Sequence, residues 1–380
     1  MGHTDLRLKI LRKVKRVVIK IGSSVLTDST SIINFNAFAT LVDQVAWMKS
    51  RGYEPVLVSS GAIAIGMRKL GLTQRPHNLP LKQAVAAVGQ TGLMENYDRF
   101  FKERNLKVGQ VLLTNVILKN RPLFLNARNT LLTLLELGII PIINENDSVA
   151  VDEIKVGDND TLAAITTSLV EADLLILLTN RDGLFEADPQ EDKHARLIHL
   201  VEKIDRKIEN LASKTKSPQG VGGMASKITA ARHATKYGVP VIIANGLVHT
   251  IVEKIFQGEN VGTLFLPQVS KLTGRKHWIA YTLVPKGKLI IDPGAQEALV
   301  KRGKSLLAIG ISHVEGSFHF GDSVAIVNHK QEEIGRGLVN YSSSELEKIK
   351  GVPAKGIEGV LGYKHFDEVI HRDDLVLFER

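Results

Sequence analysis

Six short, continuously apolar runs recur through the first two-thirds of the chain and constrain its fold more than any other feature. They are residues 16–22, 55–60, 107–114, 139–144, 174–179 and 239–245. Runs without polar alternation are typical of strands buried on both faces of a sheet. Helical patterns separate them, as in residues 35–51, where apolar residues recur every three or four positions before Gly52. This alternation predicts an α/β domain with a largely parallel sheet sandwiched by helices.

The sequence pattern changes near residue 267. Residues 267–276 contain Pro267, Ser270 and Gly274 without an apolar period, which indicates a linker. Beyond it, short strand-like runs alternate with glycine turns, so a small β-rich domain is expected. The predicted organisation is a basic N-terminal tail (1–13), an α/β domain (14–266), the linker (267–276), the β-rich domain (277–362) and a C-terminal tail (363–380).

Charge and hydropathy restrict the class of protein. The net charge is +9, but residues 1–16 hold six Lys or Arg against one acid, so most of the chain is close to neutral. We therefore expect a solvated basic tail and consider nucleic acid an unlikely partner. No run approaches the ~18 apolar residues of a membrane span. The chain has no cysteine, which is compatible with the cytoplasmic location that we expect.

Polar and small residues gather where the predicted strands end. They are Lys20 and Gly22 at the end of the first run, Ser60, Gly61 and Ala62 at the end of the second, and Thr179 and Asn180 at the end of the fifth. In a parallel sheet the carboxyl ends of the strands lie at one edge, where ligands collect. Glycine at a strand-to-helix turn also lets backbone N–H groups approach an anion. Each residue alone could be an ordinary turn or cap residue, but the whole set predicts a ligand site.

An acidic and amide-rich stretch, residues 142–162, follows the fourth run. Its side chains suit a small polar substrate and need cationic partners. We expect Asp147 and Asn159 to face the substrate and Asp160 to orient lysines.

A glycine-rich segment, "SPQGVGGMASKITAA", leads into a predicted helix with Lys227 near its start. A lysine so placed suits a transferring phosphoryl group, because negative charge spreads over the equatorial oxygens in the transition state. The alternative is a solvated loop with a surface lysine.

Taken in order, several motifs resemble one enzyme family. The segments are "VVIKIGSSVLT", "LVSSGAIAIG", "FLNARNTL", "IPIINENDSVA", "EIKVGDNDTLAA", "LLTNRDGLFEADP" and "GVGGMASKITAA". Together they resemble the glutamate 5-kinases of the amino acid kinase superfamily, and the C-terminal part resembles a PUA domain. The resemblance implies an amino acid kinase-like α/β fold. It also implies ATP-dependent phosphorylation of the γ-carboxylate of L-glutamate, the first step of proline synthesis, with Mg²⁺ bridging the phosphates.

The resemblance also implies roles for individual residues. Lys20, Asp160 and Lys227 would be catalytic. The glutamate site would contain Ser60, Gly61, Ala62, Asn144, Asp147 and Asn159. The ATP site would contain Lys20, Gly22, Thr179, Asn180, Val221, Gly222, Gly223, Met224, Ala225, Ser226 and Lys227. Feedback inhibition by proline, assembly into a homo-oligomer and transfer of the product to a glutamyl phosphate reductase are further expectations.

The chain departs from the family's usual sequence in two places, and two alternative functions stay open. Asn180 stands where the family often has Asp, and Val221 and Ser226 stand where it often has Thr. All three positions concern the nucleotide, so nucleotide preference is the property in question. The alternatives are another small-molecule kinase of the superfamily and an added RNA-binding role of the PUA-like domain.

Overall fold

The structure is a computed structural model and describes seven stretches of the chain. They are residues 3–27, 34–114, 121–149, 159–214, 223–270, 283–364 and 366–378. The chain forms two compact units: the first comprises residues 1–119 and 126–269, and the second comprises residues 120–125 and 270–380. Most of the predicted linker, residues 271–276, lies outside the described residues. Among the described helices, none has the length and apolar character needed to cross a membrane.

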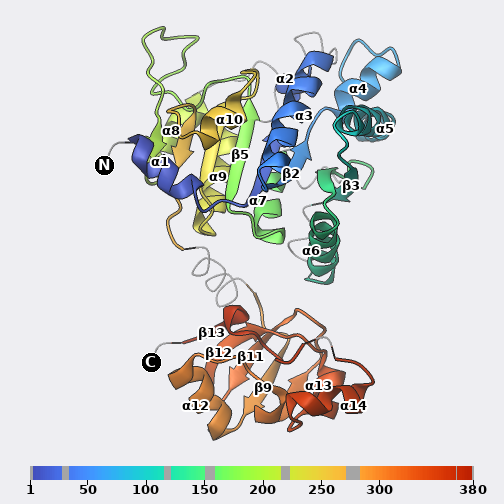
Figure 1. Cartoon of the computed structure of the whole chain (residues 1–380), viewed down its shortest axis with the longest axis vertical. Coiled ribbons are helices and arrows are strands. Elements are labelled where there is room, and N and C mark those ends of the chain that lie inside the picture. Colours follow the sequence, from blue (N-terminus) through green and yellow to red (C-terminus); the bar gives the residue numbers. More distant parts are fainter. Residues whose placement is uncertain are drawn as a thin grey trace. The chain divides into compact units, whose positions relative to one another are not determined.

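The first unit is built on an eight-stranded sheet (Figure 1). Its strands are β1 (Arg16–Ile21), β2 (Glu54–Ser59), β3 (Val108–Leu113), β4 (Ile140–Glu145), β5 (Leu174–Thr179), β6 (Leu200–Val201), β7 (Val241–Asn245) and β8 (Thr263–Phe265). Their order is β3-β4-β2-β1-β5-β7-β8-β6, and all neighbours are parallel except β7 and β8. The six predicted strands and the largely parallel sheet are therefore confirmed.

One helix precedes these strands, and the others lie between them in the sequence. They are α1 (His3–Leu11), α2 (Ser23–Leu26), α3 (Phe35–Ser50), α4 (Ala62–Lys69), α5 (Leu79–Lys102), α6 (Arg121–Glu136), α7 (Asn159–Leu169), α8 (Arg206–Lys214), α9 (Met224–Lys236) and α10 (Ile251–Phe256). The predicted apolar face of α3 is buried, and Gly52 has the left-handed φ of 81° that favours glycine just after a helix.

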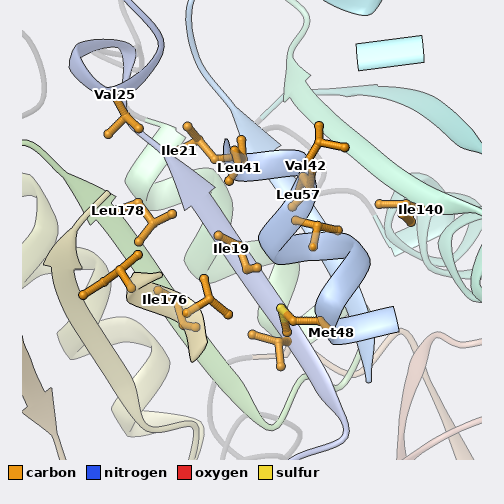
Figure 2. Close-up of a cluster of buried hydrophobic side chains, with 14 of the residues drawn as sticks. Ile19, Ile21, Val25, Leu41, Val42, Met48, Leu57, Ile140, Ile176 and Leu178 are labelled. Atoms are coloured by element: carbon orange, nitrogen blue, oxygen red, sulfur yellow. The ribbon is translucent and has the colours of Figure 1, made fainter. Parts of the chain in front are cut away.

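One hydrophobic cluster of the first unit lies on one face of the sheet. Ile19 and Ile21 of β1 pack there with side chains of α3 and β5, as Figure 2 shows. Successive side chains of a strand point to opposite faces. Lys20, between these two isoleucines, therefore points to the face opposite this cluster.

The predicted solvated N-terminal tail was wrong in its main part, because residues 3–11 form helix α1. Arg7 of this helix is only 2% exposed. Its guanidinium donates hydrogen bonds to four main-chain carbonyls, those of His199, Glu259, Val261 and Gly262. The planar fork of donors can satisfy several carbonyls at once, so this basic residue belongs to the interior of the first unit.

The second unit contains a five-stranded sheet in the order β10-β9-β11-β12-β13. The strands are β9 (Gly287–Ile291), β10 (Ile311–Gly316), β11 (Ser323–Val327), β12 (Glu333–Leu338) and β13 (Leu375–Leu377), with helices α12 (Pro293–Arg302), α13 (Ser343–Ile349) and α14 (Ile357–Leu361). The predicted C-terminal tail contributes β13, which pairs antiparallel with β12. The sheet therefore extends beyond residue 362, because the tail completes its edge.

Candidate active site

Two lysines from distant parts of the chain share one buried carboxylate. Nζ of Lys20 lies 2.7 Å from Oδ1 of Asp160, and Nζ of Lys227 lies 3.1 Å from Oδ2. The lysines are each 4% exposed and Asp160 is completely buried. We call Lys20, Asp160 and Lys227 the charged triad.

Three elements bring the charged triad together. Lys20 is the one residue of β1 that carries a charge into the interior, on the face opposite Ile19 and Ile21. Asp160 lies in the first turn of α7, where the helix dipole favours a carboxylate. Lys227 lies in the first turn of α9, which packs against α7. The alternation of side chains along β1 and the neighbouring starts of α7 and α9 therefore determine where the three side chains lie.

The environment of Asp160 keeps it ionised. Burial alone would raise its pKa, but the charges of Lys20 and Lys227 and hydrogen bonds from Lys20 and Ser226 hold the pKa well below its ordinary value. The Ser226 hydroxyl donates to Oδ2 at 2.7 Å. With two ammonium groups and one carboxylate, the triad carries a net positive charge and suits an anion.

Three helices begin after a glycine near the predicted site residues: two of these glycines lie close in sequence to Lys20 and Lys227, and the third follows Ser60. Gly22 precedes α2, Gly61 precedes α4 and Gly223 precedes α9, and none of these positions uses a side chain to cap the helix. Gly61 has φ 112°, a conformation that residues with a side chain rarely adopt. The first N–H groups of α4 and α9 thus remain suited to oxyanions.

Ser60, Asn144 and Asn159 form a second, uncharged cluster. Nδ2 of Asn159 donates to Oγ of Ser60 at 2.9 Å, to Oδ1 of Asn144 at 3.0 Å and to the carbonyl of Ser59 at 3.0 Å. Because Asn159 precedes Asp160, this amide cluster is adjacent to the charged triad. The structure therefore brings together three of the six residues predicted to bind the amino-acid substrate.

The other three predicted substrate residues lie at neighbouring helix and strand ends. Gly61 and Ala62 begin α4, directly after Ser60. Asp147 lies in the turn after β4, and among the described residues it makes no hydrogen bond to the amide cluster. Burial raises the pKa of its carboxyl, and the charge of Lys82 opposes this only in part.

The predicted nucleotide residues are described in part. Thr179 is buried at the end of β5, and its hydroxyl lies 3.5 Å from Oδ1 of the exposed Asn180. Gly223, Met224, Ala225, Ser226 and Lys227 form the start of α9. Val221 and Gly222 lie outside the described residues.

Two side chains of α5 that no sequence pattern predicts support the amide cluster. Oε1 of Gln90 accepts a hydrogen bond from Nδ2 of Asn144 at 2.8 Å. The buried Tyr97 hydroxyl lies 2.8 Å from Oγ of Ser59. Both residues lie in a helix interior, where no motif or strand end marks them.

Among the described residues, no group of three or more His, Asp or Glu side chains could hold a metal ion. Asp160 is engaged by the two lysines. A Mg²⁺ ion at this site would need ligands other than such a cluster, and phosphate oxygens and water are ligands that Mg²⁺ commonly takes.

Comparison with known proteins places the chain in a family. The profile described as "Amino acid kinase family" matches residues 15–245, and that of the "PUA domain" matches residues 287–361. A protein named "Glutamate 5-kinase" from Caldanaerobacter subterraneus is 50% identical over 365 residues, covering 96% of this chain and 98% of that protein. Another of that name from Geobacter metallireducens is 50% identical, covering 98% and 100%.

A solved structure of UMP kinase from Bacillus anthracis is 16% identical, with a TM-score of 0.46, and covers 67% of this chain and 97% of that one. The profile matches more than half of this chain, and the full-length relatives are well above the identity at which family membership is secure. The chain belongs to the amino acid kinase family and, within it, to the glutamate 5-kinases.

Proposed function

We propose that this chain transfers the terminal phosphoryl group of ATP to the γ-carboxylate of L-glutamate, forming L-glutamyl 5-phosphate in the first step of proline biosynthesis. The observation that carries the proposal is the charged triad beside the amide cluster. Asp160 belongs to a cationic site that suits phosphates, and the adjacent Asn159 belongs to a polar site that suits a small substrate.

The chemistry needs no general base. A carboxylate is already ionised at neutral pH, so one of its oxygens can attack the terminal phosphorus directly. The bond from that phosphorus to the bridging oxygen breaks, and ADP leaves with the electron pair. The main obstacle is repulsion between the carboxylate and the phosphates, which fixed positive charge and good positioning reduce.

The charged triad supplies this positive charge. We assign Lys20 to the phosphates of ATP and Lys227 to the transferred group, where negative charge spreads in the transition state. Asp160 contacts both ammonium groups and holds them in place. Its role is positioning, and its ionised state is maintained by the lysines themselves.

We assign the amide cluster and its neighbours to glutamate. Ser60, Asn144 and Asn159 supply directed hydrogen bonds, and the N–H groups at Gly61 and Ala62 suit a carboxylate. Asp147, three residues after Asn144, would contact the ammonium group. Thr179, Asn180, Gly22 and residues 221–227 are assigned to ATP, and Mg²⁺ would neutralise part of the phosphate charge.

Further parts of the proposal concern the cellular context. We propose that proline inhibits by competing at the glutamate site, that the chain forms a homo-oligomer in the cytoplasm, and that a glutamyl phosphate reductase consumes the product.

Trapping of the acyl phosphate with hydroxylamine tests the proposed reaction. With ATP and Mg²⁺, L-glutamate should give a hydroxamate, whereas aspartate, acetylglutamate, carbamate and UMP should give none or far less. Proline should suppress the signal, and more glutamate should restore it. A hydroxamate from another acid in preference to glutamate, or no hydroxamate at all, would refute the proposal.

A further inference from the structure

Gln90 of α5 lies at the far end of the amide cluster from the charged triad. Successive hydrogen bonds run from Asn159 to Asn144 and from Asn144 to Gln90, at 3.0 and 2.8 Å. Asn159 is adjacent to Asp160, so Gln90 is the member most distant from the lysines along this series. No motif assigns it a role.

Backbone groups fix the orientation of the Asn144 and Asn159 amides, and Asn144 in turn fixes that of Gln90. Oδ1 of Asn144 accepts from the N–H of Glu145, so its Nδ2 must face Gln90. Gln90 must then present Oε1 to Asn144 and direct Nε2 elsewhere. At the other end, Nδ2 of Asn159 donates to the carbonyl of Ser59, so its Oδ1 is also directed elsewhere. Reversing one amide would place two donors or two acceptors together.

Two polar atoms of this series have no hydrogen-bond partner among the described residues. They are Nε2 of Gln90, a donor, and Oδ1 of Asn159, an acceptor, and both are buried. A buried polar atom left unpaired destabilises the folded protein, because it has lost its hydrogen bonds to water. Native proteins rarely retain such atoms without a functional reason.

One free donor and one free acceptor complement the two charged groups on the α-carbon of an amino acid. We infer that Gln90 is a specificity residue whose Nε2 donates to the α-carboxylate of the substrate, while Oδ1 of Asn159 accepts from its ammonium group. This inference rests on the proposed function. The γ-carboxylate must reach the lysines, so the α-carboxylate lies toward the opposite end of the series, where Gln90 is.

The packing of α5 keeps Gln90 in place. A Cβ atom on Gly89 would lie 1.7 Å from the carbonyl oxygen of Ala62, so α5 and α4 approach closely beside Gln90. Two turns further along α5, Tyr97 contacts Ser59. Both ends of this segment of α5 are therefore held against the strand and helix that carry the amide cluster.

The variant Gln90→Glu separates the two roles of this side chain. One carboxylate oxygen can still accept from Asn144, but the donor Nε2 is replaced by an oxygen. A hydrogen bond to a charged group contributes about 1.5–3 kcal/mol, so the glutamate KM should rise about 10- to 100-fold with little change in the ATP KM. The control Thr91→Ala, at an exposed position of α5, should leave both KM values unchanged.

A substrate analogue supplies the complementary change. The α-amide of L-glutamate keeps the γ-carboxylate but presents an amide N–H donor where glutamate has the α-carboxylate. Wild-type protein should prefer glutamate. Gln90→Glu should lower the kcat/KM ratio of glutamate over its α-amide by at least about tenfold, as expected for one charged hydrogen bond. Gln90→Met should also lower this ratio, because it lacks both the donor and the carboxylate.

The outcomes separate this inference from the proposed function. If wild-type protein forms no hydroxamate with glutamate, the proposed function fails. If wild-type protein is active but Gln90→Glu and Gln90→Met keep its preference for glutamate over the α-amide, only the inference on Gln90 fails. Thermal unfolding of each variant shows whether Gln90→Glu is folded, and Gln90→Met provides the second test if it is not.

Discussion

Replacing Asp160 with asparagine would remove the only negative charge of the charged triad with little change in shape. Both lysines would stay in the interior without their shared carboxylate. The amide of asparagine can accept one hydrogen bond, but its nitrogen would face the second ammonium group. We therefore expect the first unit to lose stability.

The geometry gives the size of this loss. The ammonium nitrogens lie 2.7 and 3.1 Å from the two carboxylate oxygens. At an effective dielectric constant of about 20, the shorter contact corresponds to about 6 kcal/mol of Coulomb attraction and the longer one to about 5 kcal/mol. Desolvation of three buried charges offsets much of this attraction, and removing one partner of a buried pair typically costs about 3–5 kcal/mol. We expect a decrease of that size in the free energy of unfolding.

Tryptophan fluorescence in urea can measure this loss in the first unit alone. The chain has two tryptophans, Trp47 and Trp278. Trp47 packs near Tyr53 and Phe256 in the first unit, so a Trp278→Phe background leaves a reporter for that unit. Saturating ATP with Mg²⁺ should return part of the lost stability, because the phosphates supply a new counter-charge.

Two control variants complete the test. Lys20→Met and Lys227→Met each leave Asp160 paired with one lysine, and each removes repulsion between two ammonium groups. Each should cost less than half of what Asp160→Asn costs, while activity falls strongly. A loss below about 1 kcal/mol in Asp160→Asn would be smaller than any buried ion pair of this kind and would refute the reasoning. An equal loss in all three variants would also contradict it.

Three further results are expected. Because the folded-state pKa of Asp160 is lowered, its stabilisation is complete above its unfolded pKa of about 4 and is lost as the pH falls through the folded value. The difference in unfolding free energy between wild type and Asp160→Asn should thus be constant near neutral pH and shrink below about pH 4, in acid titrations of both proteins. Lys227→Ala should lower kcat by roughly 10²–10³, as for the loss of one preorganised charge-stabilising donor, and near-wild-type turnover would remove Lys227 from the mechanism. Asp147→Ala should raise the glutamate KM far more than the ATP KM in steady-state assays, and equal effects would contradict its assignment to glutamate.

The parts of the fold that depend on strand pattern could be predicted. Continuous apolar runs located the six main strands, and the parallel arrangement made their carboxyl ends an expected meeting point. Lys20 lies near the end of one such run and Asp160 follows another, so their proximity could be inferred before any contact was known. The N-terminal helix could not be predicted from the sequence, because the basic residues around Arg7 resemble a solvated tail. Only the carbonyl groups that Arg7 reaches, 192 to 255 residues away, make its burial favourable.

Gln90 shows why the amide cluster was only partly predictable. Its partner Asn144 lies 54 residues away, and Gln90 is in the middle of a helix rather than at a strand end. The contact depends on how closely α5 approaches α4. A signal did exist: Gly66 and Gly89 are helix-interior glycines, which cost about 1 kcal/mol each relative to alanine. In the structure, a Cβ on either would collide with a carbonyl of the facing helix.

In this chain, glycines inside helices indicate the position of the site, as polar residues at strand ends do. The physical cause is different in the two cases. A strand end exposes backbone and side-chain groups at a shared edge, whereas a helix glycine permits a close approach that places its neighbours against that edge. Gly89 lies next to Gln90, and Ala62, which it faces, lies two residues after Ser60. The cationic half of the site is set by the sheet and the starts of α7 and α9, and the amide half is set in addition by the contact between α4 and α5. A substitution at that helix contact should thus affect glutamate recognition before it affects the lysines.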